Sequence, residues 1–281
     1  MELKAHAKLN LSLEVLERRA DGYHNLHSVF QFVSLCDNVI LEKSEADSFW
    51  CSEEGLNTEN NLALKARDLL RREYPVGPVS IRLEKHTPAM SGMGGGSADC
   101  AAVLHGLNQI FELHIPREKL MELGSQLGAD VPACLVGGVL LAQGIGEKIT
   151  PMQQPEPLWF NIIKPGVAFS TGEMYAKLNR DTTPIQPRNI TPLVDAITRG
   201  EAMGVGANLF NSFESVAQPK EPIQQARVAL LQTGALGVCM TGSGSAVFGV
   251  YADEQTARLG YETIKETGAE VYCCHSVHAK E

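Results

Sequence analysis

Apolar residues occupy every second position between Leu9 and Val15, with polar residues between them. This period of two is typical of a half-buried strand, which we predict over residues 4–16. A turn follows at residues 20–24, because Asp21-Gly22 is a strong turn signal. Residues 29–41 read as a second strand, which we expect to break at Asp37-Asn38.

Helical spacing appears next along the chain. Asn60 or Asn61 can cap a helix that carries the apolar residues Leu62, Ala66, Leu69 and Leu70. Residues 79–83 alternate as a strand and lead into a glycine-rich segment. Ser97 can cap a helix over residues 98–111, and Pro116 is suited to open another. A further strand is predicted at residues 137–142.

A proline-rich joint at residues 151–157 has no periodicity and marks the most plausible boundary. We therefore divide the chain into an N-terminal domain, residues 1–155, and a C-terminal domain, residues 156–281. Beyond the joint, the pattern predicts strands at 159–163, 238–240, 246–251 and 271–274, and helices at 171–178, 190–198, 208–216, 221–231 and 254–267. Helices and strands are mixed without strict alternation, which favours the α+β class.

Composition narrows the range of functions. The chain has 281 residues, of which 44% are hydrophobic and 20% charged, as in a soluble globular protein. Its net charge of −9 argues against a general nucleic-acid or anionic-membrane binder. It leaves open a small anionic ligand, because backbone N–H groups can hold phosphate on an acidic protein.

The cellular location is read from the cysteines and the N-terminus. Seven cysteines without a C-x-x-C pair are typical of reduced thiols in a cytosolic protein. No uncharged stretch reaches the roughly 18 residues of a membrane span, and the first residues do not resemble a targeting signal. We expect a cytoplasmic protein.

The strongest chemical signal is the segment Pro88-Ala-Met-Ser-Gly-Met-Gly-Gly-Gly-Ser97, between a predicted strand and a predicted helix. Glycines allow backbone N–H groups to approach an anion, and the helix N-terminus adds partial positive charge. The spacing matches neither the P-loop nor the dinucleotide fingerprint. A flexible loop that ends in a capped helix is the alternative, but four glycines within residues 92–96 favour an anion site.

Other candidates are ambiguous when taken alone. Thr241-Gly-Ser-Gly-Ser-Ala246 fits a ligand loop or a tight hairpin equally well, and Gly144-Ile-Gly146 reads as a turn. Lys8 is either a solvated residue on a polar strand face or a functional cation. Asp130 is either a helix cap, which composition favours, or a base. The C-terminal Cys273-Cys274-His275-Ser-Val-His278 does not match structural zinc spacing, so a final strand and tail is the better interpretation.

Several of these segments together resemble a known family along most of the chain. Ala7-Lys8-Leu-Asn10-Leu, Arg19-Ala-Asp21-Gly-Tyr-His24 and Phe30-Gln-Phe32 are similar to the 4-diphosphocytidyl-2-C-methyl-D-erythritol kinases of the GHMP kinase superfamily. The glycine-rich segment resembles the ATP-phosphate loop of that superfamily. Gly128-Ala-Asp130-Val-Pro132 resembles its catalytic-aspartate segment, and the glycines after Thr241 resemble its third motif.

The resemblance implies a two-domain α+β fold, with a ribosomal-S5-like N-terminal half, a ferredoxin-like C-terminal half and the site in the cleft between them. It implies that Asp130 is the base and Lys8 the cation beside it. The ATP phosphates would be wrapped by Pro88, Ala89, Met90, Ser91, Gly92, Met93, Gly94, Gly95, Gly96, Ser97 and Ala98. Asn61 and Lys85 would lie on the adenosine side. The cytidine-bearing substrate would be lined by Asn10, Tyr23, His24, Phe30 and Tyr175.

The implied reaction is ATP-dependent phosphorylation of the substrate's 2-hydroxyl, with ATP and Mg²⁺ required and Ser97 as the candidate magnesium contact. Ser91 and Met93 depart from the family's usual glycine and leucine. Because Gly92 and residues 94–96 remain, we expect ATP binding to survive. Two alternatives stay open at this point: another GHMP kinase acting on a small alcohol such as homoserine, and a non-catalytic nucleotide sensor on the same fold.

Overall fold

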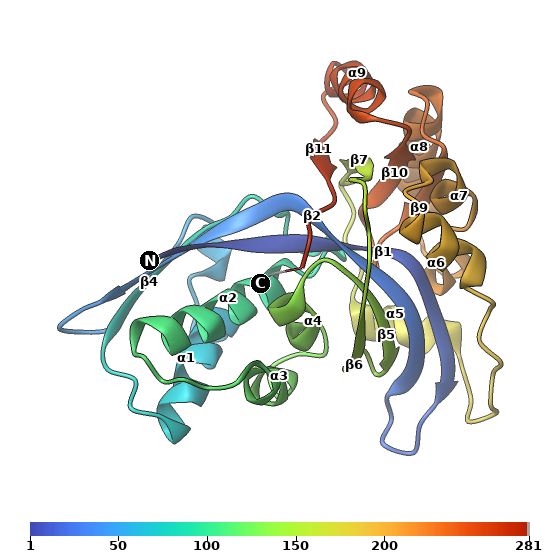
Figure 1. Ribbon diagram of the computed structural model, residues 1–281. Coiled ribbons are helices and arrows are strands. Elements are labelled where there is room, and N and C mark those ends of the chain that lie inside the picture. The colour runs from blue at the N-terminus through green and yellow to red at the C-terminus, as the bar shows by residue number, and fades with distance from the viewer. Residues whose placement is uncertain (280–281) are drawn as a thin grey trace.

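The computed structural model of the protein, which describes residues 1–279, contains two β-sheets with helices packed against each (Figure 1). The strands of the first sheet are β1 (Glu2–Arg18), β2 (His24–Lys43), β3 (Ser48–Cys51), β4 (Val79–Glu84), β5 (Val139–Gly144), β6 (Lys148–Met152) and β8 (Phe210–Asn211). The 20-residue strand β2 pairs with β1 along its length, with β5 through its first half and with β4 through its second.

The first strand confirms the period-two prediction and explains how two polar residues leave the core. Leu9 and Leu11 are fully buried in the core between the two sheets. Successive side chains of a strand point to opposite faces, so Lys8 and Asn10 project the other way, toward a cleft. Register shifts between β1 and β2 lie on both sides of this stretch, and such bulges commonly re-aim side chains beside active sites.

Helices cover the face of the first sheet away from the second. They are α1 (Leu62–Glu73), α2 (Gly95–Ile110), α3 (Arg117–Ser125) and α4 (Val131–Val136), and a 3₁₀ turn, η1 (Glu54–Leu56), precedes them (Figure 1). The side chain of Asn61 accepts a hydrogen bond from the Ala63 N–H and caps α1, as the sequence predicts.

The start of α2 differs from the prediction. The helix begins at Gly95, and Gly94, in the left-handed conformation, takes the cap position. The Ala98 N–H donates to the Gly94 carbonyl oxygen over 2.9 Å, so the helical turn already includes residues 95–97. Ser97 therefore lies inside the first turn and does not cap the helix.

The second sheet is antiparallel, in the order β11 (Val271–His275), β7 (Trp159–Ile163), β10 (Val247–Tyr251) and β9 (Gly237–Met240). Its helices are α5 (Thr171–Leu178), α6 (Thr191–Thr198), α7 (Ala202–Ala207), α8 (Lys220–Gln232) and α9 (Glu254–Lys265). Residues 153–158, which join β6 to β7, form neither helix nor strand. The mixture of elements confirms the α+β class.

Two further local predictions are wrong, and long-range contacts explain both. The helix expected at 208–216 is instead the short strand β8 followed by the 3₁₀ turn η2 (Ser212–Ser215). The Asn211 side-chain amide donates to the carbonyl oxygens of Met240 and Gly242, which holds this segment extended. The break expected at Asp37-Asn38 is absent, because Asp37 is fully buried with hydrogen-bond partners within an unbroken β2.

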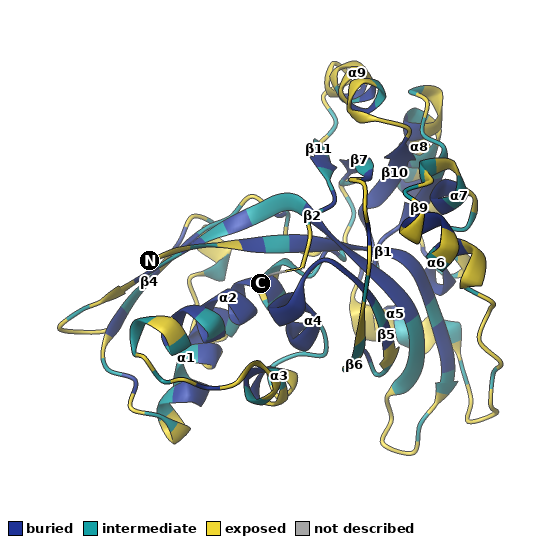
Figure 2. Ribbon diagram, viewed as in Figure 1, coloured by how far each residue is buried: buried dark blue, intermediate teal, exposed yellow. Residues whose placement is uncertain are grey.

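Buried residues form one core beneath the first sheet and another between the two sheets (Figure 2). The inter-sheet core packs Leu9 and Val29 of the first sheet together with Phe160 and Phe248 of the second. A third core fills the space around α5, α8 and the second sheet. No disulfide joins the cysteines of residues 1–279, and none of the described helices is both long and apolar enough to cross a membrane.

Candidate active site

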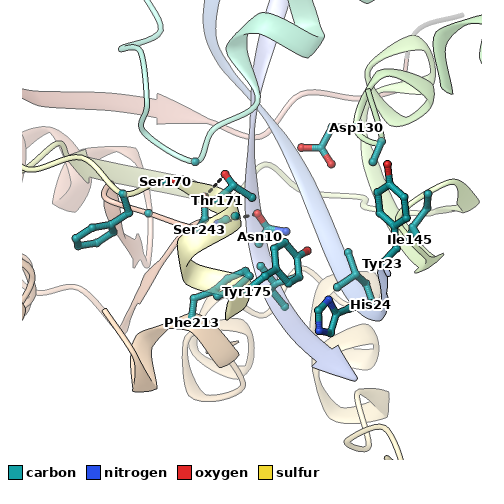
Figure 3. Close-up of a pocket in the computed structure, with 18 of the residues that line it drawn as sticks. Asn10, Tyr23, His24, Asp130, Ile145, Ser170, Thr171, Tyr175, Phe213 and Ser243 are labelled. Atoms are coloured by element: carbon teal, nitrogen blue, oxygen red, sulfur yellow. Dashed lines mark hydrogen bonds between the residues drawn. The ribbon is translucent and has the colours of Figure 1, made fainter. Parts of the chain in front are cut away.

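A cleft of about 980 Å³ lies where β1 and β2, the glycine-rich segment, α5 and the segment 242–244 meet. Figure 3 shows the labelled side chains around one space, with Asp130, Tyr23 and Ile145 on one side and Ser170, Thr171 and Ser243 on the other. The hydroxyl groups of Thr171 and Ser243 form a hydrogen bond, with 2.9 Å between Thr171 Oγ1 and Ser243 Oγ. Segments far apart in the sequence thus converge on one cavity.

Lys8 and Asp130 form an ion pair in this cleft. The Lys8 ammonium lies 3.5 Å from Asp130 Oδ2, and it donates a 2.7 Å hydrogen bond to Asn10 Oδ1. It also lies 4.9 Å from the centroid of the Phe30 ring. The Lys8 side chain is only 5% exposed, whereas that of Asp130 is 33% exposed. The carboxylate can therefore reach a substrate, while the ammonium beside it is fixed.

These contacts remove one of the two interpretations left open for each residue. Lys8 is buried, so it is not a solvated residue on a polar strand face. Asp130 occupies the position before α4, yet its side chain makes no capping hydrogen bond. Its carboxylate faces Lys8 instead. The structure thus brings the Lys8 ammonium and the Asp130 carboxylate together in one cleft.

The glycine-rich segment forms the adjoining wall of the cleft. Met90, Gly92, Gly94 and Ser97 line it, and the helix α2 begins there. The first N–H groups of a helix have no partner within it and carry partial positive charge, which suits a phosphate group. A Cβ atom at Gly94, where φ is +72°, would lie 3.2 Å from Lys8 Cε, so a larger residue would crowd the ion pair.

The second glycine segment packs directly against the first. A Cβ atom at Gly92, where φ is +80°, would lie 2.2 Å from the Thr241 carbonyl oxygen. One at Gly242 would lie 2.5 Å from the Gly92 carbonyl oxygen, and the Ala246 N–H donates to the Ser91 carbonyl oxygen over 3.1 Å. The second glycine segment is therefore not merely a hairpin connection, and its residues 242–244 line the cleft.

The two unusual residues of the glycine-rich segment fit their positions. Ser91 is buried and is not among the positive-φ residues of the described chain, so its backbone does not require glycine. Met93 is fully buried in the inter-sheet core. Methionine is apolar and similar in size to leucine, so it suits this buried position.

The hairpin between β1 and β2 forms the opposite end of the cleft. Asp21 Oδ1 accepts a 3.1 Å hydrogen bond from the Tyr23 N–H, and Gly22 has a φ of +88°, which confirms the predicted turn. His24 stacks on Tyr175 of α5, with ring centroids 5.0 Å apart. Tyr175 in turn meets Phe213 edge-on. Tyr23 is 61% exposed at the rim.

The electrostatic surroundings of this end favour neutral His24. Burial, and then the positive charges of Arg18 and Arg180, lower the pKa of His24. Burial, with a smaller contribution from Asp130, raises the pKa of the Tyr175 phenol. At neutral pH both rings are therefore uncharged, and His24 has one nitrogen able to accept and one able to donate a hydrogen bond.

Titration of His24 by NMR is expected to give a pKa below the ordinary histidine value of about 6.5. Arg180→Met should raise that pKa, because one of the two nearby positive charges is removed. Arg199→Met, at an exposed position on another surface, is the control and should leave it unchanged. Because the folded protein disfavours the protonated ring, its free energy of unfolding is fully retained above about pH 6.5. It decreases as the pH falls from there through the pKa of His24 in the folded protein. An unchanged His24 pKa in Arg180→Met would contradict this account.

The structure does not bring every expected site residue into the cleft. Lys8, Asn10, Tyr23, His24, Phe30, Asp130 and Tyr175 all line it. Asn61 instead caps α1, and its amide donates to the Leu56 carbonyl oxygen over 3.0 Å. Lys85 is buried against two carboxylates behind the glycine-rich segment. Neither residue lines the cleft.

Sequence reasoning missed two cations, Arg18 and Arg180, that line the cleft near His24. Neither makes a side-chain ion pair within residues 1–279, and Arg180 Nε is buried without a hydrogen-bond partner. Arg18 directly precedes the recognisable hairpin, so its position could have been inferred. Arg180 follows α5 in a segment without any motif.

The residues present suit a magnesium ion that is shared with phosphates. No group of three or more His, Cys, Asp or Glu side chains in the described chain could cage a metal by itself. Mg²⁺ normally takes one or two protein oxygens, substrate phosphates and water, so a full protein cage is not required. Asp130 and the Ser97 hydroxyl both line the cleft beside the start of α2 and provide suitable oxygen atoms.

Comparison with known proteins shows what the chain is similar to. The family models for the GHMP kinases N terminal domain and the GHMP kinases C terminal domain match residues 61–138 and 193–270. The 4-diphosphocytidyl-2-C-methyl-D-erythritol kinase of Caldicellulosiruptor bescii is 41% identical over 270 residues, which cover 94% of each chain.

Two solved structures extend the comparison. A crystal structure of 4-(cytidine 5'-diphospho)-2C-methyl-D-erythritol kinase matches with a TM-score of 0.84 and 32% identity, covering 98% of this chain and 99% of that one. Homoserine kinase from Cytophaga hutchinsonii matches with a TM-score of 0.70 at 19% identity, covering 99% and 96%, and shares the fold. The chain therefore belongs to the GHMP kinases and, within them, to the family of 4-diphosphocytidyl-2-C-methyl-D-erythritol kinases.

Proposed function

We propose that the protein transfers the γ-phosphoryl group of ATP to the 2-hydroxyl of 4-diphosphocytidyl-2-C-methyl-D-erythritol, a step of the non-mevalonate isoprenoid pathway. The observation that carries the proposal is the Lys8–Asp130 pair, which lies in one cleft with the glycine-rich segment and the Tyr23-His24 hairpin. The glycine-rich segment suits the phosphates of the donor, the ion pair suits the reacting hydroxyl, and the hairpin suits a nucleobase. The family relationship supports the same substrate.

The glycine-rich segment would bind the ATP phosphates. Backbone N–H groups at the start of α2 would donate to phosphate oxygens, and the helix dipole would favour their negative charge. Gly92 and Gly94 both line the cleft there, and a side chain would crowd Thr241 at the first position and Lys8 at the second. The Ser97 hydroxyl would help to hold Mg²⁺, whose charge would offset that of the phosphates.

Asp130 would act as the base. In the transfer, the substrate oxygen forms a bond to the γ-phosphorus and the bond to the β,γ-bridging oxygen breaks. ADP leaves, and the hydroxyl proton passes to Asp130. Lys8 lies 3.5 Å from this carboxylate and would stabilise negative charge that develops beside it. Asn10 holds the ammonium in place and also accepts a 2.9 Å hydrogen bond from the Gly242 N–H.

The other end of the cleft would bind the cytidine. Tyr23 and Tyr175 offer aromatic surfaces for the pyrimidine, and Phe30 lies beneath the Lys8 ammonium. Neutral His24 can accept a hydrogen bond from the cytosine N4 amine. The protein would thus act on two small molecules. We also place the border between its N- and C-terminal halves at residues 155 and 156, within the joint between the sheets.

The two alternatives differ from this proposal in what they require of the cleft. A kinase of a small alcohol such as homoserine would not need the aromatic residues and the histidine at the hairpin end of the cleft, because its substrate carries no nucleobase. A nucleotide sensor would not need a paired base and cation beside the phosphate loop, and both are present here. The similarity between this chain and the homoserine kinase structure concerns the fold only.

The test is ADP release from ATP with a panel of alcohols. We expect release with 4-diphosphocytidyl-2-C-methyl-D-erythritol and none with homoserine or mevalonate. A ³¹P NMR spectrum of the product should show a new phosphomonoester while the diphosphate stays intact. Turnover of homoserine alone would support the first alternative. ATP binding without turnover of any acceptor would support the sensor.

A further inference from the structure

A buried cluster of three charges lies directly behind the glycine-rich segment. The Lys85 ammonium lies 2.5 Å from Asp37 Oδ2 and 2.5 Å from Asp99 Oδ2. The three side chains are 3%, 0% and 4% exposed, so water does not reach the cluster. Lys85 is the first residue after β4, Asp37 is in β2, and Asp99 is in α2.

The cluster fixes both ends of the glycine-rich segment. At its start, the backbone N–H groups of His86 and Thr87 donate to Asp37 Oδ1 over 2.6 and 2.7 Å. At its end, Asp99 lies one helical turn beyond Gly95, the first residue of α2. Residues 88–94 therefore run between two points that are held by the same ammonium.

Side-chain packing adds a second connection between the two ends. A Cβ atom at Gly95 would lie 3.1 Å from Thr87 Cγ2 and 3.6 Å from Asp37 Oδ2. The start of α2 thus rests directly on the strand-side anchor, with no room for a larger residue. A displacement of Thr87 or Asp37 would be passed to the first turn of α2, where Ser97 lines the cleft.

The charges of the cluster do not add simple stability. Burial opposes the charged form of Lys85, but Asp99 and Asp37 together raise its pKa, so the ammonium persists. Burial raises the pKa of Asp99 to about 7, and Asp99 Oδ1 has no hydrogen-bond partner. Replacing a buried ion pair with apolar residues of similar volume is often neutral or stabilising. A geometric role accounts better for a cluster at this position.

We propose that Lys85, bridging Asp37 and Asp99, is a positioning residue that holds the glycine-rich segment in the conformation that binds the ATP phosphates. The inference rests on the proposed function in requiring ATP as the ligand. Lys85 would lie behind the loop and affect nucleotide binding through the conformation of the loop backbone. This role replaces the direct adenosine contact that the sequence led us to expect. A preformed loop binds more tightly because less conformational entropy is lost on binding.

Three variants and two ligands test this role. Lys85→Met removes the bridge, and its ATP Kd by calorimetry is expected to rise about tenfold or more, equivalent to about 1.4 kcal/mol. Its adenosine Kd should stay at the wild-type value, because adenosine lacks the phosphates that the loop binds. Asp99→Asn keeps an oxygen acceptor for Lys85 and the shape of the side chain, so its ATP Kd should remain close to wild type. Asp99→Leu, which removes that acceptor, should resemble Lys85→Met.

Controls separate positioning from loss of stability. Leu230→Ala empties a buried site in α8, in the third core, and should lower Tm without changing the ATP Kd. In the unsubstituted protein without nucleotide, hydrogen exchange should show the His86 and Thr87 N–H groups protected. This last measurement does not depend on any variant folding.

Several outcomes would overturn the inference. An equal loss of ATP and adenosine affinity in Lys85→Met would restore the direct adenosine contact. Unchanged ATP affinity in Lys85→Met and Asp99→Leu, or rapid exchange of the His86 and Thr87 amides, would show that the cluster does not hold the loop. A wild-type protein that binds no ATP would instead count against the proposed function.

Discussion

Asp130→Asn is expected to lower kcat by about 10²- to 10⁴-fold, the range for loss of a general base. Asparagine has nearly the same shape, but it cannot accept the proton of the substrate hydroxyl. Lys8 keeps its 2.7 Å hydrogen bond to Asn10, so the buried ammonium is not left without a partner. Steady-state kinetics with the cytidyl substrate and calorimetry with ATP would separate an effect on turnover from an effect on ATP binding. We expect kcat to fall strongly and the ATP Kd to change little.

Asp195→Asn provides the matched control for this experiment. Asp195 is an exposed residue of α6 and does not line the cleft, so the same chemical change there should leave kcat unaltered. The Tm of Asp130→Asn should stay close to that of the wild type. Near wild-type kcat in Asp130→Asn would show that another group takes the proton, and the role of Asp130 would then be limited to its ion pair with Lys8.

His24→Ala is expected to remove most of the discrimination between the cytidine substrate and its uridine counterpart. A site with matched buried polar groups can reject the wrong partner by up to about 10⁴-fold, because those groups are then left unpaired. Aromatic stacking alone does not choose between two pyrimidines. In wild type we expect a high ratio of kcat/KM for cytidine over uridine, and in His24→Ala a ratio approaching one.

Tyr175→Phe is the control for the packing around His24. It keeps the ring that stacks on His24 at 5.0 Å and removes only the phenol oxygen. Its cytidine preference should therefore be retained, even if its KM changes. Wild type that accepts cytidine and uridine equally would refute the role of His24, and so would a His24→Ala variant with undiminished preference.

Elements whose signals are local could be predicted from the sequence. The strand period around Leu9 and Leu11, the turn at Asp21-Gly22 and the cap at Asn61 each depend on residues within a few positions of one another. The glycine-rich segment was also recognisable, because the run of glycines and the following helix are contiguous. These features require no knowledge of which segments meet in three dimensions.

Features that depend on distant segments could not be predicted in the same way. The 208–216 region is not a helix because Asn211 bonds to carbonyl groups some thirty positions further along the chain, at Met240 and Gly242. The burial of Lys8 results from Asn10, Phe30 and Asp130 closing around it, and its local pattern resembles that of a solvated lysine. Arg180 joins the cleft only because α5 lies beside the β1–β2 hairpin.

The direct contact of Gly92 with Thr241 and Gly242 restricts how this nucleotide site can change. No side chain fits at Gly92 unless the backbone 149 positions further on moves as well, and the same holds in reverse for Gly242. Mutagenesis that varies one glycine segment at a time will therefore sample mostly inactive proteins. Libraries that vary both segments together, with compensating changes, offer the practical route to altered nucleotide use. Homologues that carry a larger residue at one of these positions should carry a second change at the other.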